Sequence, residues 1–208
     1  MAELLPDEQV TKSTYDALAA QWAGEHSTSS GLWQDEMQRF HELLPSGKII
    51  EIGAGGARDA KELVELGYDY VGTDVSSGLL EIARKELPDY PFLEQSVYDL
   101  DFNSEPFDGF WASAVLLHIP KNRIDEALQR IRTVVQARAI GFISIKDGED
   151  ERLEQEEVGG KILDRYFAYW TKDDFTEHLE ADGFKVVDYS YRPMSEKTKW
   201  HCFFVEAE

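Results

Sequence analysis

The 208-residue chain is poor in cysteine, in basic side chains and in long apolar runs. Its single cysteine, Cys202, has no partner for an intrachain disulfide, so we expect a reduced, cytoplasmic setting and a buried rather than reactive thiol. No stretch approaches the ~20 apolar residues of a membrane helix, and the opening residues lack the pattern of a signal peptide. With 42% hydrophobic and 30% charged residues, the composition predicts an ordinary soluble globular protein.

Basic residues are outnumbered: 21 Lys and Arg face 41 Asp and Glu, a formal net charge of −20. Binding to a nucleic-acid backbone or to an anionic membrane needs a basic surface, so we expect neither partner. An acidic surface also promotes solubility by itself. The charge therefore excludes partners and identifies none.

From residue 48 onward, segments with strand character alternate with segments of helical periodicity. Such alternation predicts an α/β fold, a doubly wound, Rossmann-like sheet of seven mostly parallel strands with helices on both faces. Because the last two strands have no helix between them, we expect them to form an antiparallel hairpin at the C-terminal edge. The expected strands cover residues 48–53, 68–74, 90–96, 107–116, 139–146, 184–192 and 199–207; the expected helices between them cover 58–67, 77–87, 123–135 and 171–183.

Two further helices, 13–24 and 32–45, precede the alternating part. We expect Ser13 to cap the first of them and Gly24 to end it. The chain is thus predicted to be one domain, 1–208, with an N-terminal helical cap over 1–45 and a core over 46–208.

The segment 147–170 is too long for a tight connection, and long insertions often serve as lids or binding segments. Gly159 and Gly160 are predicted as a hinge within it. The acidic run 149–157 is predicted to be a solvated helix face.

The stretch "EIGAGGARDA" turns from the first strand into a helix through Gly53 and Gly55. Glycine permits positive φ and close approach of a ligand, which is typical of nucleotide sites. A dinucleotide fingerprint would need glycine where Arg58 stands, and no P-loop lysine follows. Asp74, at the end of the second strand, is placed to accept both ribose hydroxyls of an adenosine ligand. Two acids, Glu51 and Asp74, favour a ligand that carries positive charge over a diphosphate.

In this order of motifs the chain resembles the class I S-adenosylmethionine-dependent methyltransferases of the small-molecule-type branch, over roughly residues 45–206. "EIGAGGARDA" is similar to the family's first motif, and "YVGTDVSSGLLEIARK" to the second strand with its ribose-binding acid. "FDGFWASAVLLHIP" is similar to the fourth strand and the loop that faces the methyl group, and "GFISIKDGEDE" to the fifth strand. The resemblance implies S-adenosyl-L-methionine as cofactor, with S-adenosyl-L-homocysteine as product, and a small-molecule substrate.

The resemblance also implies the residues of the site. Arg58 is expected either to reach the ligand's carboxylate or to pair with a nearby acid. Where the family often has an acid after the third strand, this chain has Ser96, so the adenine contact is expected from the Ser96 hydroxyl, from Asp99 or from the Val97 amide. The full set of expected cofactor contacts is Tyr15, Glu51, Gly53, Ala54, Gly55, Arg58, Asp74, Val75, Ser96, Val97, Ala112 and Ser113.

His118 is the candidate general base, because it follows the fourth strand and an ordinary imidazole titrates near neutral pH. Its alternative role is to brace the loop or to cap the next helix. Tyr15 is expected on a helix that covers the cofactor, whereas Trp22 on the same helix is expected to pack as part of its apolar face. No metal site is expected, since the potential ligands do not cluster. Acceptor contacts are predicted from Lys146, Arg165, Tyr166 and Tyr169.

The leading functional hypothesis is therefore methyl transfer to a small molecule. A second is a partner or regulatory protein that binds the cofactor without catalysis. A third, a nicotinamide-dependent oxidoreductase, is disfavoured by Arg58. The acceptor, the methylated atom and the oligomeric state do not follow from the sequence.

Overall fold

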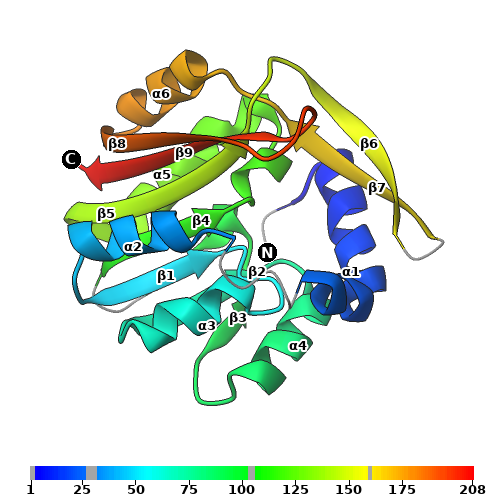
Figure 1. The fold of residues 1–208 in the computed structure, drawn as a ribbon, viewed down its shortest axis with the longest axis horizontal. Helices are drawn as coiled ribbons and strands as arrows, with labels where there is room; N and C mark the ends of the chain where they lie inside the picture. Colours follow the sequence, from blue (N-terminus) through cyan, green and yellow to red (C-terminus); the bar gives the residue numbers. More distant parts are fainter. Residues whose placement is uncertain (1–2, 27–31, 103–105, 159–160) are drawn as a thin grey trace.

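The computed structural model describes residues 3–26, 32–102, 106–158 and 161–208. A seven-stranded sheet in the order β3-β2-β1-β4-β5-β9-β8 forms its centre, and a two-stranded sheet, β6-β7, lies beside α1 (Figure 1). The strands are β1 (Lys48–Ile52), β2 (Asp69–Asp74), β3 (Phe92–Glu94), β4 (Phe107–Ser113), β5 (Val135–Lys146), β6 (Glu151–Val158), β7 (Lys161–Ala168), β8 (Phe184–Pro193) and β9 (Lys199–Ala207).

The predicted doubly wound α/β sheet is confirmed. The pairs β1–β2, β1–β4, β2–β3 and β4–β5 are parallel, whereas β9 runs antiparallel to both β5 and β8. The expected C-terminal hairpin is therefore present, with β8 at the edge. From β1 the chain continues to β2 and β3 on one side of the sheet, and then returns to β4 on the other side of β1. The carboxyl ends of β1 and β4 are therefore the switch point, where ligands of such folds bind.

Helices cover both faces of the sheet. Successive side chains of the central strands point to opposite faces and are apolar on both, so both faces are buried. One core packs side chains of α5 (Ile124–Val134) and α6 (Lys172–Ala181) against residues such as Phe110 and Phe203. The other packs α2 (Gln34–Leu43), α3 (Arg58–Glu65) and α4 (Ser77–Glu86) against residues such as Trp111 and Phe142. Short 3₁₀ turns, η1 (Val97–Asp99), η2 (Leu116–His118) and η3 (Lys121–Arg123), follow β3 and β4. Cys202 is buried in β9 as expected, and burial raises the pKa of its thiol to about 12.

The first helix differs from its predicted bounds. Helix α1 runs from Pro6 to His26, so it starts seven residues before Ser13 and passes through Gly24. Proline suits the first helical position, and the Glu8 carboxylate accepts a hydrogen bond from the Leu5 amide at 2.7 Å, which caps the true start. The prediction of Ser13 as cap and Gly24 as end was wrong for this reason.

The acidic run 149–157 was wrongly predicted as a helix face. Its residues form β6, which pairs with β7 in an antiparallel hairpin beside α1 (Figure 1). Glutamate favours helices only by a few tenths of a kcal/mol per residue, and the ladder with β7 outweighs that preference. The proposed hinge at Gly159 and Gly160 lies outside the described residues.

Candidate active site

A cleft of about 1750 Å³ lies at the carboxyl ends of the parallel strands. Its lining includes Ile52 from β1, Asp74 from β2, Ser113 from β4 and Lys146 from β5. Pockets for one small ligand usually hold about 300–1000 Å³. The cleft therefore has room for a nucleoside-sized ligand together with a second molecule.

The glycine turn forms one wall of the cleft. Gly53 and Gly55 have φ angles of 74° and 54°, the left-handed region that favours glycine. A Cβ at Gly53 would lie 2.5 Å from the Val115 side chain, so this position also lacks space for one. The amides of Gly53 and Ala54 donate to the Thr73 carbonyl at 2.8 and 2.9 Å. The turn is thus bonded to the end of β2 instead of leaving these amides open to a ligand.

Asp74 sits where β2 ends and lines the cleft, as predicted. Its two carboxylate oxygens accept hydrogen bonds from the amides of Gly55 and Ser76, each at 2.8 Å. Burial raises the pKa of Asp74, while these amides act to lower it. The side chain therefore fixes the glycine turn and still presents a carboxylate edge to the cleft.

Glu51 lies at the bottom of the same wall and is 3% exposed. The hydroxyl of Tyr70 donates a hydrogen bond to its carboxylate. Burial raises the pKa of Glu51 well above its usual range, and the charge of Asp59 raises it further. Arg58 pairs with Asp59, with Nε 2.6 Å from Oδ1. Of the two predicted roles for Arg58, the structure thus shows the ion pair with a neighbouring acid.

The turn after β3 forms another part of the lining. The Ser96 hydroxyl accepts a hydrogen bond from the Tyr98 amide at 3.3 Å and caps η1. Val97 also lines the cleft, whereas Asp99 does not belong to its lining. Gln95 is a lining residue that the sequence analysis missed. Its buried Oε1 has no hydrogen-bond partner among the described residues, and the same holds for Ser113 Oγ on β4.

His118 stands in a chain of hydrogen bonds that connects three parts of the molecule. Its Nδ1 lies 2.6 Å from the Tyr166 carbonyl, so Nδ1 carries the proton and donates. Its Nε2 then accepts from the Tyr15 hydroxyl of α1 at 3.0 Å, and Arg165 donates to the same hydroxyl at 3.2 Å. Burial lowers the pKa of His118 to about 3, and the charges of Arg165 and Lys146 also lower it. The hydrogen bond to the Tyr166 carbonyl acts in the opposite direction and raises the pKa.

The predicted acceptor contacts divide into two pairs. Lys146 and Arg165 line the cleft. Tyr166 and Tyr169 do not, and this part of the prediction is corrected. Their hydroxyls donate to carboxylates of β6, Tyr166 to Glu151 and Tyr169 to Glu154, so the hairpin holds both rings outside the cleft.

Among the predicted cofactor contacts, only Ala112 is absent from the lining of the cleft. It is fully buried one residue before the tip of β4. Its neighbours Ser113 and Ala114 line the cleft instead, and Ala114 has a positive φ of 53°.

Aromatic side chains missed by the sequence analysis complete the cleft near Lys146. Phe167 from β7, Trp33 next to α2 and Trp200 from β9 all line it. Trp200 is paired with Lys146 across β5 and β9, which places both side chains on the same side of the sheet. Only the strand pairing brings these two residues together, so no local pattern could have found them.

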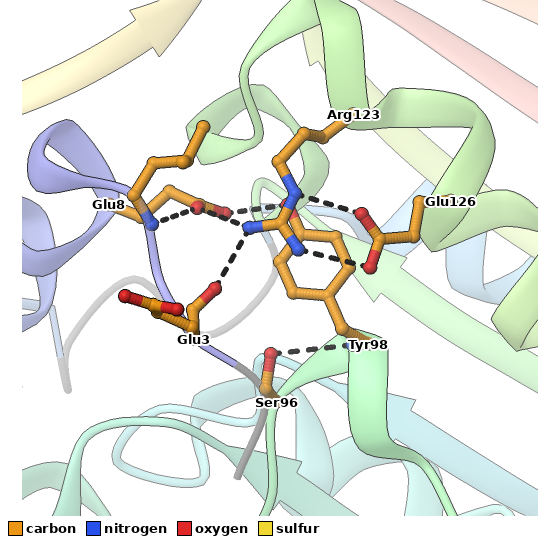
Figure 2. A network of polar contacts seen from close by, with 7 residues as sticks. Glu3, Glu8, Ser96, Tyr98, Arg123 and Glu126 are labelled. Carbon is orange, nitrogen blue, oxygen red and sulfur yellow. Dashed lines mark hydrogen bonds and ion pairs between the residues drawn. The ribbon is translucent and has the colours of Figure 1, made fainter.

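A polar cluster fastens the start of α1 beside the turn after β3 (Figure 2). The Glu8 carboxylate accepts from the Tyr98 hydroxyl at 2.6 Å and pairs with Arg123 at 2.9 Å. The Arg123 guanidinium also lies 3.7 Å from the centre of the Tyr98 ring and forms two hydrogen bonds with Glu126. Because Tyr98 follows Ser96 and Val97, this cluster joins the covering helix to the wall that those residues form.

Comparison with known proteins identifies the fold and family. Residues 49–138 match the protein family described as "Methyltransferase domain". Over these residues the chain carries a methyltransferase domain. An uncharacterized methyltransferase of Oceanobacillus iheyensis is 22% identical over 157 residues, which are 76% of this chain and 70% of that protein. A demethylmenaquinone methyltransferase of Renibacterium salmoninarum is 26% identical over 88 residues, which are 41% of this chain and 37% of that protein.

Solved structures share the fold over the whole chain. The 1,6-didemethyltoxoflavin-N1-methyltransferase of Burkholderia thailandensis, with 1,6-didemethyltoxoflavin and S-adenosylhomocysteine bound, superposes with a TM-score of 0.75 at 18% identity. That match covers 100% of this chain and 92% of the other. The magnesium protoporphyrin IX methyltransferase of Synechocystis PCC 6803, solved with S-adenosylmethionine, gives a TM-score of 0.76 at 12% identity and full coverage of both chains.

Two kinds of feature are absent from the described residues. Residues 3–26, 32–102, 106–158 and 161–208 hold no cluster of three or more His, Cys, Asp or Glu side chains that could bind a metal ion. Within the same ranges, no helix combines the length and the apolarity needed to cross a bilayer.

Proposed function

We propose that this methyltransferase transfers the methyl group of S-adenosylmethionine to a small organic acceptor bound in the same cleft. The observation that carries the proposal is the crowding of acids around the glycine turn. Glu51 and Asp74 both line the cleft, and burial, more than the charges of Asp59 and Asp74, raises the pKa of Glu51. A ligand with a cationic ammonium and a sulfonium would stabilise these acids in their charged form.

The unpaired polar atoms of the cleft support the same cofactor. Gln95 Oε1 is a buried acceptor beside Ser96 and Val97, where the amino group of an adenine ring can donate. Ser113 Oγ is a second such atom at the tip of β4. In this proposal Asp74 holds the ribose, Val75 packs on adenine, and Glu51 with the turn Gly53–Gly55 holds the methionine portion.

When bound, S-adenosylmethionine supplies an activated methyl group, which an acceptor lone pair takes while the bonding electrons stay on sulfur. The protein's part is to align the two molecules and to exclude water. Helix α1 carries out the second task, because Tyr15 lines the cleft and is held to His118 and Arg165. His118 is a weak base with both nitrogens engaged, so we assign it the positioning of Tyr15 instead of proton removal.

Calorimetric titration with S-adenosylmethionine and S-adenosylhomocysteine tests cofactor binding. Detection of S-adenosylhomocysteine across a panel of acceptors, including demethylmenaquinone and 1,6-didemethyltoxoflavin, then tests transfer. We expect micromolar or tighter cofactor binding and product with at least one acceptor. Failure to bind either compound would overturn the proposal. Tight binding without turnover on the whole panel would favour the non-catalytic partner protein.

A further inference from the structure

The part of the cleft beyond the glycine turn has a distinct chemical character. Six lining residues form it, and we refer to them as the acceptor chamber: Trp33, His118, Lys146, Arg165, Phe167 and Trp200. They come from α2's start, η2, β5, β7 and β9, whereas the proposed cofactor contacts come from α1, from β1, β2 and β4, from the turns after β1, β2 and β3, and from the start of α3. The chamber therefore adjoins the cofactor wall without sharing its acids.

Two cations of the chamber rest on aromatic rings. Lys146 Nζ lies 3.7 Å from the centre of the Phe167 ring, and the Arg165 guanidinium carbon lies 5.1 Å from the same centre. Arg165 is also 4.7 Å from the centre of the Trp22 ring. Cation–π contacts of this kind hold a charged group in place over a ring. The Phe167 ring is thus flanked by two positive charges.

Two indoles add neutral donors to the chamber. Trp33 and Trp200 meet edge to face at 5.4 Å, and they are 2% and 8% exposed. In the part of the chain that the structure describes, neither Nε1 has a hydrogen-bond partner. Both rings line the cleft, and a ligand with acceptor atoms could satisfy these donors.

Glu154 of β6 is an acid that interacts with Lys146 but lies outside the cleft lining. Burial raises its pKa, whereas its hydrogen bonds from Tyr169 and Arg152, each 2.7 Å long, and the charge of Lys146 lower it. Glu154 is therefore bound to Tyr169 and to its own strand.

Resting on the methyl-transfer function proposed above, we infer that the acceptor is a planar organic acid ionised at neutral pH, such as an aromatic carboxylate. The acid group is held by Lys146 and Arg165, and the ring packs among Phe167, Trp33 and Trp200. An oxygen of the ionised group takes the methyl group: a C–O bond forms from its lone pair, and the C–S bond breaks with its electrons left on sulfur. No proton has to be removed in this step, which agrees with a chamber whose only imidazole, among the described residues, already donates and accepts. The positive chamber also contrasts with the acidic surface of the chain, so it selects against cationic amines.

Competitive binding in the presence of S-adenosylhomocysteine tests this inference without requiring turnover. The probes are benzoate, salicylate and 2-naphthoate, each measured beside its primary amide, which keeps the shape and removes the charge. For the wild-type protein we expect at least one carboxylate to bind tenfold or more tightly than its amide. Lys146→Met should abolish that preference, and Lys146→Arg should restore most of it.

Lys172→Met is the matched control, because Lys172 also lies over a ring, 4.4 Å from the centre of Tyr189, but outside the cleft. It should leave the preference unchanged. If S-adenosylhomocysteine binds and no carboxylate binds more tightly than its amide, the inference is overturned and the proposed function stands. A Lys146→Met variant that loses S-adenosylhomocysteine affinity instead would place Lys146 at the cofactor and also overturn it. If S-adenosylhomocysteine itself fails to bind the wild-type protein, the proposed function fails.

Discussion

Asp74 shows how a single side chain serves both the fold and the proposed ligand. Its carboxylate accepts from the amides of Gly55 and Ser76, and so holds the glycine turn against α4. Each oxygen can accept further hydrogen bonds, and the side chain lines the cleft. The sequence predicted the position of this acid, but not that it also orders the turn.

Asp74→Asn should weaken S-adenosylmethionine binding by at least tenfold, measured by calorimetry. The amide replaces one acceptor oxygen by a donor, and a hydrogen bond to a charged group contributes about 1.5–3 kcal/mol. Asp69→Asn is the control, because Asp69 is exposed at the other end of the same strand. Equal affinities of the Asp74→Asn variant and the wild type would refute the ribose assignment.

The low pKa of His118 has a consequence for stability. In the unfolded chain the imidazole has its ordinary pKa of 6.5 and binds a proton below that pH. In the folded protein burial lowers its pKa to about 3. The unfolded state therefore gains protons first, and His118 makes the fold less stable as the pH falls from 6.5 toward 3. This acid-side loss is specific to the buried, doubly hydrogen-bonded ring.

Between pH 7 and pH 5, the free energy of unfolding should fall by about 1–2 kcal/mol less in the His118→Gln variant than in the wild type. Urea unfolding of both proteins at both pH values measures this difference. Carboxylates contribute equally to both proteins, so the difference between them isolates the imidazole. A variant whose loss over this pH range matches that of the wild type would show that His118 titrates normally in the fold.

At the scale of elements, α1 is the covering helix of the cleft and is held along its length. Its first turn joins the Glu8–Tyr98–Arg123 cluster of Figure 2, and its middle contacts the β7 strand through Thr14, whose hydroxyl donates to the Asp164 carbonyl at 2.8 Å. The Asp16 carboxylate accepts from the Ser76 hydroxyl and the Gly78 amide of α4. Opening of the cleft therefore requires α1 to leave several polar contacts at once.

Tyr98→Phe should destabilise the protein by about 1–3 kcal/mol, because it removes a buried hydrogen bond to the Glu8 carboxylate. Amide hydrogen exchange in α1 should also become faster. Tyr191→Phe offers a matched control, since its hydroxyl donates to Asp147 but its side chain is 43% exposed. The cluster would not be fastening α1 if both variants had equal effects on exchange in that helix.

Over the whole molecule the charge of −20 opposes the compact state by self-repulsion. Glu151 and Glu157 of β6 are exposed, so salt can screen them. The chamber cations, in contrast, line the cleft. The cleft thus holds acids at the glycine turn and cations in the acceptor chamber.

Raising the ionic strength from 0.01 to 0.15 M shortens the Debye length from about 30 to about 8 Å. At pH 7 the thermal midpoint should rise by about 2–4 °C, as expected for about 1 kcal/mol in a chain of this size. The same titration near pH 4, where carboxylates lose about half their charge, should give a smaller rise. A midpoint that stays constant or falls at pH 7 would contradict the argument.

The sequence by itself determined the alternation of strands and helices in the central sheet, the C-terminal hairpin and most of the predicted residues that line the cleft. These features depend on local patterns, because apolar periodicity and glycine, proline and acid positions act over a few residues. The exposed β6 strand and the early start of α1 escaped this reasoning. Glu151 and Glu154 join a strand only through their pairing with β7, and Glu8 caps α1 while bound to Tyr98 and Arg123.

The acceptor chamber was decided by the tertiary structure alone. Lys146 and Trp200 meet because β9 inserts antiparallel between β5 and β8, and Arg165 enters the cleft because β6 turns β7 back toward α1. Tyr166 and Tyr169 are turned away by the same hairpin. Contacts between residues dozens of positions apart follow from strand register and packing, which a single sequence does not specify.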